Sequence, residues 1–555
     1  MKRKFLASVS LMMASVMMLS ACGSSDAESA DNSQKSEENS QESTVQSESA
    51  STEDTVEEEK ELVTLTLWVP EQPDLDYDTC LETVYLEEKF NVDLQFDVYS
   101  SSADSATLFN LMITGDEYPD IFCQRYSTSQ VTAAAEAGAI LPLNDYITDG
   151  TAYKTVLEEN AGWESMLTTT DGNIYNFPYS DVGIHKQSEY KMWYNADMLE
   201  NLGWDAPPST PEEFKEYLIA IRDNDANGNG DATDEIPLMG YYGGRKTDPI
   251  AFLMNPFELY TENYYYITDD NEIYFSAVTD GWRDGLRYIA DLYAEGLIAE
   301  ETYIQDRSTF MGHLNKEVVT VGVFPCWYGG NDIDTSVMSW FDYPAMAPLK
   351  GNYQQTAARV GSELNLGCMI SSTCENPDRA YELLDWLISE EGTWFTGWGV
   401  EDETYERVDA ENYLGTNNTI KVIDTYAESG EKWFWNGSTH PRVDSAEVRY
   451  ASEKDESMIE TDNTLILVSS AQVYEPYYVN HNTPNIIWCA DEDVVQAVAD
   501  YKTNINTHIS TMNTQFITGR LDINDDAVWQ NYLNELEAMD LDGYIETLEQ
   551  YYGLK

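Results

Sequence analysis

The feature that most constrains the fold is a regular alternation of strand and helix patterns near the start of this 555-residue chain. Residues 62–70 (LVTLTLWVP) and 92–99 (VDLQFDVY) alternate apolar or β-branched side chains with polar ones, which is typical of strands. Residues 79–90 between them have helical spacing, and residues 105–123 contain a helix pattern, a glycine turn and a short apolar run. Strands separated by helices predict a parallel sheet with crossover helices, so we expect an α/β fold.

The same alternation continues along the chain. Helices are predicted at residues 208–224 and 281–298, and a strand is predicted at residues 317–325. A further helix is predicted at residues 376–392, which begin with an asparagine and end with a glycine. Single cores stop growing beyond about 250–300 residues, so a chain of this length is expected to contain at least two domains or lobes.

The first residues resemble an export signal. Three basic residues at positions 2–4 precede an apolar run at residues 5–19, which is too short to span a membrane comfortably. The following sequence, LSAC, ends at Cys22 and resembles a bacterial lipobox, which implies that residues 1–22 are a lipoprotein signal peptide and that Cys22 carries the lipid, palmitate included. The alternative is a chance cysteine at the end of an ordinary signal peptide. Residues 23–61 are rich in Ser, Glu, Asp and Gln, and we expect a disordered acidic tether there.

The charge of the chain argues against one class of partner. The sequence has 30 Lys and Arg against 100 Asp and Glu, which gives a formal net charge of -70. Such a field repels phosphate backbones, so we expect no nucleic-acid binding. It also disfavours polyanionic ligands such as pectate, unless a local basic pocket overrides it.

Patterns for hydrolytic or zinc chemistry do not occur in the sequence. There are five histidines, and neither an HExxH nor a GxSxG motif is present. A catalytic carboxylate pair cannot be recognised among 100 Asp and Glu, and we expect no enzymatic activity. The cysteines after Cys22 form no CxxC pair, so they are either buried thiols or one or two disulfides: Cys80, Cys123, Cys326, Cys368, Cys374 and Cys489.

Residues 223–235 (DNDANGNGDATDE) have the composition of a calcium-binding loop. Aligned with an EF-hand loop, the stretch has Asp, Asp and Asn at positions 1, 3 and 5, a glycine at the sharp turn, and Asp at position 12 where Glu is usual. Oxygen ligands favour Ca²⁺ over zinc, and a strand pattern follows the loop, so we expect a structural Ca²⁺. A turn that binds no metal is the alternative. The predicted ligands are Asp223, Asp225, Asn227, the carbonyl of Asn229, Asp231, Asp234 and Glu235, with either of the last two closing the site.

Several segments, in their order and spacing, resemble one family. The chain resembles the family 1 extracellular solute-binding proteins of carbohydrate ABC importers, and among them the long lipoprotein branch that includes alginate-binding proteins. The last segment has Asp402 where that branch usually has glycine. The matching segments are GDEYPDIF at 115–122, GAILPLNDYI at 138–147, DGNIYNFPYS at 171–180, MWYNADMLENLGWDAPPSTPEEF at 192–214, ENPDRAYELLDWLISEEG at 375–392 and GWGVEDETYERVD at 397–409.

This resemblance implies a periplasmic-binding-protein-like type II fold, with two α/β lobes and a ligand cleft between them. Lobe 1 would comprise residues 62–180, with residues 360–397 returning to it. Lobe 2 would comprise residues 181–359 and carry the calcium loop. Residues 398–555 would be a helical part that completes lobe 2 and the hinge. The chain would cross between lobes near residues 179–183, 359–363 and 397–403.

A carbohydrate cleft needs flat aromatic faces for sugar rings and planar polar groups for hydroxyls. The chain has 14 Trp and 38 Tyr, and several of them follow predicted strands; burial in a core is the competing interpretation for any one of them. In FPCWYGGND (324–332) a strand ends in an aromatic pair, and the glycines after it allow close backbone approach. In KWFWNGSTHPR, Arg442 adds a fork-shaped donor. The candidate ligand-binding residues are Trp68, Glu71, Arg125, Tyr179, Trp282, Trp327, Tyr328, Trp398 and Trp435.

The resemblance implies a binding component that holds a carbohydrate, expected to be an oligosaccharide, and delivers it to membrane permease subunits by hinge closure. The protein would be lipid-anchored at the extracellular face of the cell membrane. Two alternatives remain open from the sequence. One is a cell-surface polysaccharide-processing hydrolase, and the other is a solute-binding protein for a non-sugar ligand such as a peptide.

Overall fold

The structure is a computed structural model. It describes residues 61–72, 75–100, 105–115, 117–180, 183–187, 190–242, 246–327, 342–351, 355–359, 364–423, 434–435, 439–454, 463–480 and 483–554. The predicted signal peptide with Cys22, nearly all of the predicted tether and the candidate Tyr328 lie outside these residues.

The first part of the chain forms the predicted parallel arrangement. β1 (Val63–Pro70) pairs in parallel with β2 (Val92–Tyr99) and with β3 (Ile121–Phe122). The two crossover helices are α1 (Leu81–Phe90) and α2 (Ser105–Met112). These elements match the predicted alternation closely, because each has a clear apolar periodicity in the sequence.

Strands from distant parts of the chain complete this sheet. They are β4 (Asn176–Ser180), β12 (Leu364–Ile370) and β15 (Arg442–Val443), and the strand order is β15-β4-β12-β3-β1-β2. β12 is antiparallel to both β3 and β4, whereas β15 is parallel to β4. Every strand except β12 therefore has its carboxyl end at the same edge of the sheet.

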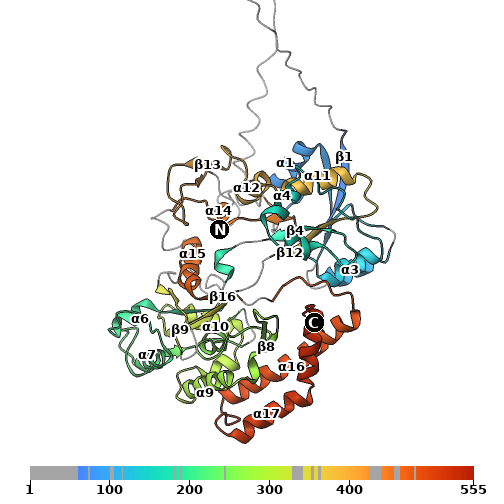
Figure 1. Cartoon of the computed structure of the whole chain (residues 1–555). Helices are drawn as coiled ribbons and strands as arrows, with labels where there is room; N and C mark the ends of the chain where they lie inside the picture. The colour runs from blue at the N-terminus through green and yellow to red at the C-terminus, as the bar shows by residue number, and fades with distance from the viewer. Residues whose placement is uncertain are drawn as a thin grey trace, which may run out of the picture. The chain divides into compact units, whose positions relative to one another are not determined.

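The core of the six-stranded sheet is formed by its strands and by the helices that flank them. Leu67, Phe122 and Ile370 are fully buried in this core. Figure 1 shows α1 grouped with β1, β4 and β12, together with α4 (Ala152–Glu159) and α11 (Pro377–Leu387). α3 (Thr128–Glu136), which follows β3, adds Val131 and Ala134 to the same core.

A second sheet has four strands in the order β10-β5-β9-β6. β9 (Val321–Cys326) is buried along its whole length and is parallel to β6 (Ile236–Leu238). β5 (Lys191–Tyr194) is antiparallel to β9, and β10 (Ala345–Met346) is antiparallel to β5. The amino end of β5 and the carboxyl ends of β6 and β9 therefore lie at one edge.

Helices cover the second sheet and build its core. They include α6 (Ala196–Asn201), α7 (Pro211–Asp223), α8 (Ile250–Met254), α9 (Asp280–Ala294) and α10 (Arg307–Leu314). Three C-terminal helices, α16 (Glu492–Ile517), α17 (Asp526–Ala538) and α18 (Leu541–Tyr551), pack together, and α16 contacts α9. Trp282 of α9 and Tyr532 of α17 are both fully buried in the shared core.

The two sheets thus contribute to separate hydrophobic clusters, and we propose that the two sheets correspond to the two lobes. Residues 398–454 differ from the helical segment expected there. Their described residues include β13 (Tyr405–Val408), β14 (Thr419–Val422), the sheet strand β15 and the short helix α14 (Ala446–Arg449). The long helices begin with α15 (Asn463–Tyr474) and α16.

Capping residues mark the first residues of two helices in the predicted segments. At α7, the Thr210 hydroxyl accepts a hydrogen bond from the Glu213 backbone N–H at 3.2 Å, as a capping residue should. The single helix predicted at 376–392 is instead two helices, because α11 ends at Leu387 and α12 (Glu390–Trp398) begins after it. Ser389 caps the second helix through a hydrogen bond from the Gly392 backbone N–H at 3.1 Å.

The six described cysteines are free thiols, five of them buried and Cys489 partly exposed. Cys368 lies on β12 and Cys123 directly follows the neighbouring strand β3; burial together with the nearby Cys368 thiol raises the pKa of Cys123. Among the helices of the described residues, none combines the length and the apolar character that crossing a membrane requires.

Candidate functional site

A cavity of about 450 Å³ lies at the carboxyl edge of the six-stranded sheet. Arg125 reaches it from the turn after β3, Tyr179 from the end of β4 and Arg442 from β15, where Arg442 pairs in register with Tyr179. Ligands of α/β sheets bind at such carboxyl edges. We call this cavity the arginine pocket; it is lined by Arg125, Tyr179, Gly397, Trp398, Arg442, Val448, Arg449, Tyr450, Thr464 and Leu467.

Arg125 and Tyr179 form one wall of the arginine pocket. The Arg125 guanidinium carbon lies 4.2 Å from the centroid of the Tyr179 ring, and Arg125 Nη2 donates to Tyr179 Oη at 3.3 Å. Stacking of this kind holds a guanidinium in place without using all of its five donors. Arg125 is exposed to solvent, so its remaining N–H groups can reach a ligand.

Arg442 and Arg449 converge on one buried carboxylate at the same pocket. Arg442 Nε donates to Asp444 Oδ1, and Arg449 Nη1 lies 3.6 Å from Asp444 Oδ2. The Asp444 side chain is only 1% exposed, so a buried carboxylate holds both arginine side chains in position. Three guanidinium groups thus line one cavity of a strongly acidic protein.

Trp398 adds an aromatic surface to the arginine pocket. It is the last residue of α12, and its indole N–H donates to the Val448 carbonyl at 2.7 Å. The ring is partly exposed and lines the cavity. The arginine pocket therefore combines aromatic surface with fork-shaped donors, as a site for a hydroxylated ring requires.

Three of the predicted aromatic candidates lie in hydrophobic cores instead. Trp68 is 2% exposed and packs against Tyr99 with ring centroids 4.3 Å apart. Trp282 is 0% exposed in the core of the second sheet. Trp435 is 3% exposed, and its indole N–H donates to Thr83 Oγ1 at 2.9 Å. Because no face of these rings is open in this structure, we leave all three out of the proposed site.

The other candidates have different positions. Glu71 is exposed just after β1, where its backbone N–H donates to the Tyr99 carbonyl at 2.8 Å; its side chain is not among those lining the arginine pocket. Trp327 is partly exposed and directly follows β9, at the carboxyl edge of the second sheet. The structure thus brings together Arg125, Tyr179 and Trp398 of the residues predicted for the ligand.

Sequence reasoning did not identify Arg449 and Tyr450. Arg449 is the last residue of α14, and Tyr450 directly follows this helix. With four residues, α14 has no apolar periodicity from which it could be predicted. More than three hundred positions separate them from Arg125, and only the strand order of the sheet brings them to the same cavity.

The residues predicted to bind calcium lie at the end of α7 and in the loop that follows it. Asp223 is the last residue of α7, is exposed, and faces Arg222, with Arg222 Nε and Asp223 Oδ1 2.7 Å apart. The loop proper starts at Asp225, whose Oδ2 accepts from the Gly230 backbone N–H at 2.9 Å. Gly228 and Gly230 have φ values of 71° and 94°, which side chains other than glycine rarely tolerate.

Two carboxylate oxygens of this loop are buried without a hydrogen-bond partner among the described residues: Asp225 Oδ1 and Glu235 Oε2. Asp234 instead accepts from the Asn229 side-chain amide at 2.9 Å. In the part of the chain that the structure describes, no three His, Cys, Asp or Glu residues converge in a metal-binding group. Any cation here would therefore rely on asparagine and backbone oxygens as well, which suits Ca²⁺ rather than zinc.

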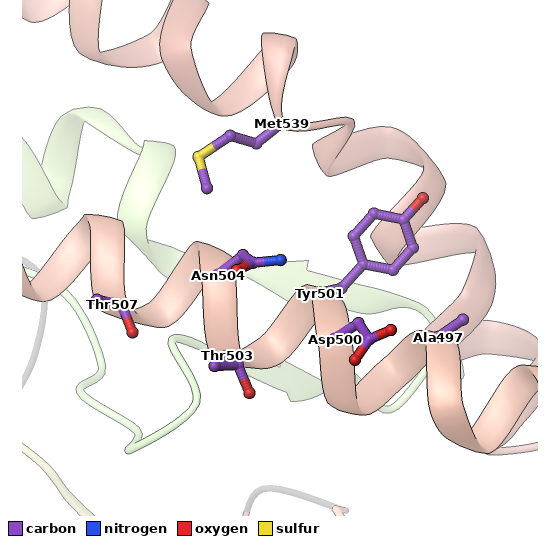
Figure 2. A pocket seen from close by; sticks show the side chains of 7 residues that line it. All are labelled: Ala497, Asp500, Tyr501, Thr503, Asn504, Thr507 and Met539. Atoms are coloured by element: carbon purple, nitrogen blue, oxygen red, sulfur yellow. The ribbon is translucent and has the colours of Figure 1, made fainter.

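A larger groove of about 670 Å³ lies on the C-terminal helices, away from either sheet edge. Figure 2 shows Tyr501, Asn504 and Thr507 along α16, with Met539 opposite them. The Tyr501 hydroxyl donates to Asp540 at 2.7 Å, and its ring stacks on Tyr544 with centroids 5.5 Å apart. Because its main aromatic ring is already engaged, this groove is a weaker candidate than the arginine pocket.

Comparison with known proteins agrees with this architecture. Residues 85–399 match the family model described as bacterial extracellular solute-binding protein. A curated relative, the fructooligosaccharide ABC transporter substrate-binding protein FusA of Streptococcus pneumoniae, is 26% identical; the match covers 99% of this chain and 98% of the relative.

Two solved structures share the fold. One is an EF-hand mutant of S. pneumoniae FusA in complex with fructo-nystose, with a TM-score of 0.66, 23% identity, and coverage of 88% of this chain and 99% of that one. The other is an extracellular solute-binding protein from Bifidobacterium longum subsp. infantis, with a TM-score of 0.72, 17% identity, and coverage of 88% and 98%. The α/β solute-binding fold expected from the sequence is confirmed. The chain belongs to the bacterial extracellular solute-binding protein family.

Proposed function

We propose that this protein is the substrate-binding component of an ABC importer and that it binds an oligosaccharide at the arginine pocket. The observation that carries the proposal is the meeting of Arg125, Tyr179 and Trp398 at the carboxyl edge of the six-stranded sheet. A relative that matches almost the whole chain is named as a fructooligosaccharide-binding protein, which supports a carbohydrate ligand.

The chemistry of the pocket suits a sugar. The Trp398 ring offers a flat apolar surface for the C–H face of a sugar ring, and the Arg125 guanidinium offers directed donors for hydroxyl groups. The shared carboxylate of Asp444 keeps Arg442 and Arg449 in fixed positions, so little side-chain freedom is lost when a ligand binds.

In this proposal the protein binds and releases but performs no chemistry. Ligand would be held between the two lobes, and hinge closure would present the loaded form to the permease subunits. The basic residues, the apolar run and the LSAC sequence support lipidation at Cys22 and anchoring at the extracellular face of the membrane.

A titration of the protein without its first 60 residues against neutral oligosaccharides, including kestose, tests the function. We expect saturable binding by calorimetry and a higher melting temperature, because a ligand that binds only the folded state stabilises it. Arg125→Ala should weaken binding about ten-fold or more, in line with about 1.5–3 kcal/mol for a charge-assisted hydrogen bond. The control is Arg520→Ala, an exposed arginine that follows α16 and should leave affinity unchanged.

The alternatives give different results in the same experiment. Steady release of shorter sugars would favour a surface polysaccharide-processing hydrolase. Stabilisation by peptides, with no response to any oligosaccharide, would contradict a carbohydrate ligand and favour a non-sugar solute.

We further propose that the loop at 225–235 binds a structural Ca²⁺. The buried, unpartnered oxygens of Asp225 and Glu235 support this, since a buried acceptor without a donor is unfavourable unless a cation satisfies it. The FusA structure named for an EF-hand mutant gives independent support from a relative. We leave Asp223 out of the proposed ligand set because its carboxylate pairs with Arg222.

A further inference from the structure

A second cavity lies where β6 ends, and it shares no lining residue with the arginine pocket. Its volume is about 270 Å³. Tyr190 comes directly before β5 and Tyr242 follows β6, so both belong to the same edge of the four-stranded sheet. Ser510, Asn513 and Thr514 of α16 form the opposite wall. We call this cavity the tyrosine pocket, since its wall includes Tyr190, Tyr242, Tyr260, Tyr264 and Tyr303.

The charges of the tyrosine pocket favour a neutral ligand. The Lys246 ammonium is 3.1 Å from the Glu262 carboxylate at the rim and 4.8 Å from the centroid of the Tyr190 ring. That position disfavours a second cation over the Tyr190 ring. The Asp248 carboxylate in the same wall disfavours an anion.

Two polar groups of the wall retain unused hydrogen-bonding capacity. The Tyr303 hydroxyl is buried and has no hydrogen-bond partner among the described residues. Asp248 Oδ1 accepts from the Ile250 backbone N–H at 3.0 Å, and no described side chain donates to its second oxygen. Burial raises the pKa of Asp248 to about 6, so the group is a carboxylate acceptor at neutral pH.

A buried side chain behind the tyrosine pocket holds two of its lining residues in position. The Trp282 indole N–H donates to Asn513 Oδ1 at 3.3 Å, which directs the amide NH₂ of Asn513 away from Trp282. The Trp282 ring also stacks on Tyr260, with centroids 6.0 Å apart. Trp282 is thus a positioning residue for two members of the pocket, although it is itself fully buried.

We propose that the tyrosine pocket binds one neutral sugar ring, with Asp248 and Tyr303 hydrogen-bonding its hydroxyl groups and tyrosine rings covering its C–H face. The inference rests on the proposed function and adds a separate subsite on the second sheet. The cavity is smaller than the roughly 300–1,000 Å³ typical of drug-sized ligands, which suits a single ring. The ring is either a free monosaccharide or the terminal unit of the oligosaccharide.

Calorimetric titration of Tyr303→Phe and Asp248→Asn against the same oligosaccharides tests the inference. We expect Tyr303→Phe to weaken binding about three- to ten-fold and Asp248→Asn about ten-fold or more, as for neutral and charged hydrogen bonds. The matched control is Tyr293→Phe. Tyr293 contacts the Tyr303 ring with centroids 5.7 Å apart but does not line the pocket, so its variant should bind like the wild type.

The outcomes separate the two proposals. Wild-type binding that is lost in Arg125→Ala but unchanged in Tyr303→Phe and Asp248→Asn would overturn the tyrosine pocket and leave the proposed function intact. No binding of any sugar by the wild type would overturn both proposals. Preferential binding of a quaternary ammonium such as choline in the tyrosine pocket would overturn the tyrosine pocket alone. A parallel titration with glucose and fructose distinguishes the sources: sensitivity of monosaccharide binding to Tyr303→Phe indicates a free ring, whereas an effect limited to oligosaccharides indicates a terminal unit.

Discussion

Trp398 and Trp282 are chemically identical side chains with opposite environments. Trp398 ends a helix beside an open cavity, and its N–H is held by the Val448 carbonyl. Trp282 lies inside the second core, and its N–H is held by Asn513. The sequence predicts both tryptophans as candidate ligand contacts, with burial in a core as the competing interpretation for each one. Only the packing around each ring separates a binding surface from a structural anchor.

Truncating each tryptophan should therefore have a different effect. Trp282→Ala should lower the free energy of unfolding by about 3–5 kcal/mol, the usual cost of deleting a large buried aromatic side chain. Trp398→Ala should change stability much less but weaken oligosaccharide binding. Urea denaturation and calorimetry measure the two effects. Equal losses of stability in both variants would contradict this assignment.

Asp248 predicts a pH dependence of stability. Burial raises its pKa from 3.8 to about 6, so the folded state holds this proton more tightly than the unfolded state does. The stabilisation from this proton is complete below about pH 3.8 and is lost as the pH rises through about 6. Relative to Asp248→Asn, the wild type should lose at most about 3 kcal/mol over that interval. Denaturation at several pH values measures the difference, and the exposed Asp205→Asn should show no comparable effect.

At the scale of elements, loop 225–235 is encoded almost entirely by local sequence. Its side-chain oxygens accept from backbone N–H groups two to five residues later, as in the bonds from Asn229 to Asn227 at 3.0 Å and from Asp231 to Asn229 at 2.7 Å. Composition alone was therefore enough to locate the loop. Helix α7 extends through Asp223, the first ligand predicted from the sequence, so the ligand set proposed here begins at Asp225.

Removing calcium should destabilise the protein through this loop. We expect a chelator to lower the melting temperature of the wild type, corresponding to about 1.4–2.7 kcal/mol when calcium had been present at 10–100 times its Kd. Asp225→Ala and Glu235→Gln should abolish the response. Asp223→Ala should keep it, because that carboxylate faces Arg222 outside the loop. An identical melting temperature with and without chelator in the wild type would rule out a stabilising calcium.

The pair α11 and α12 shows that apolar periodicity alone does not locate every helix boundary. Residues 376–392 have continuous helical spacing, yet the chain turns after Leu387. Ser389 offers the backbone a competing hydrogen bond to the Gly392 N–H, and that cap starts a new helix. Two shorter helices then present Trp398 at the arginine pocket.

At the scale of the whole molecule, each sheet has one edge with a proposed binding pocket, and the chain runs from β4 through the short helix η1 (Ile184–Gln187) to β5. Hinge closure around a ligand predicts a more compact form. Small-angle scattering should report a smaller radius of gyration when saturating oligosaccharide is added. Arg125→Ala at the same sugar concentration should stay close to the unliganded value. No change in the wild type under confirmed saturation would contradict hinge closure.

The sequence by itself determined the fold class, the family, the first five elements of the chain (β1 to β3 with their crossover helices α1 and α2) and the position of loop 225–235. Each of these depends on short-range patterns: apolar periodicity, capping residues, and motif order along the chain. Arg125 could also be proposed because it follows a predicted strand of the parallel sheet. Tyr179 could be proposed because the family resemblance implies that the chain crosses between lobes near residues 179–183.

Only the tertiary structure decided which distant residues meet. Arg449 joins Arg125 because β15 pairs with β4 at the edge of the six-stranded sheet, and Tyr303 joins Asn513 because α16 packs against α9. It also decided that Trp68, Trp282 and Trp435 are core residues. Burial and long-range pairing depend on how elements pack, and neither leaves a periodic signal in the sequence around one residue.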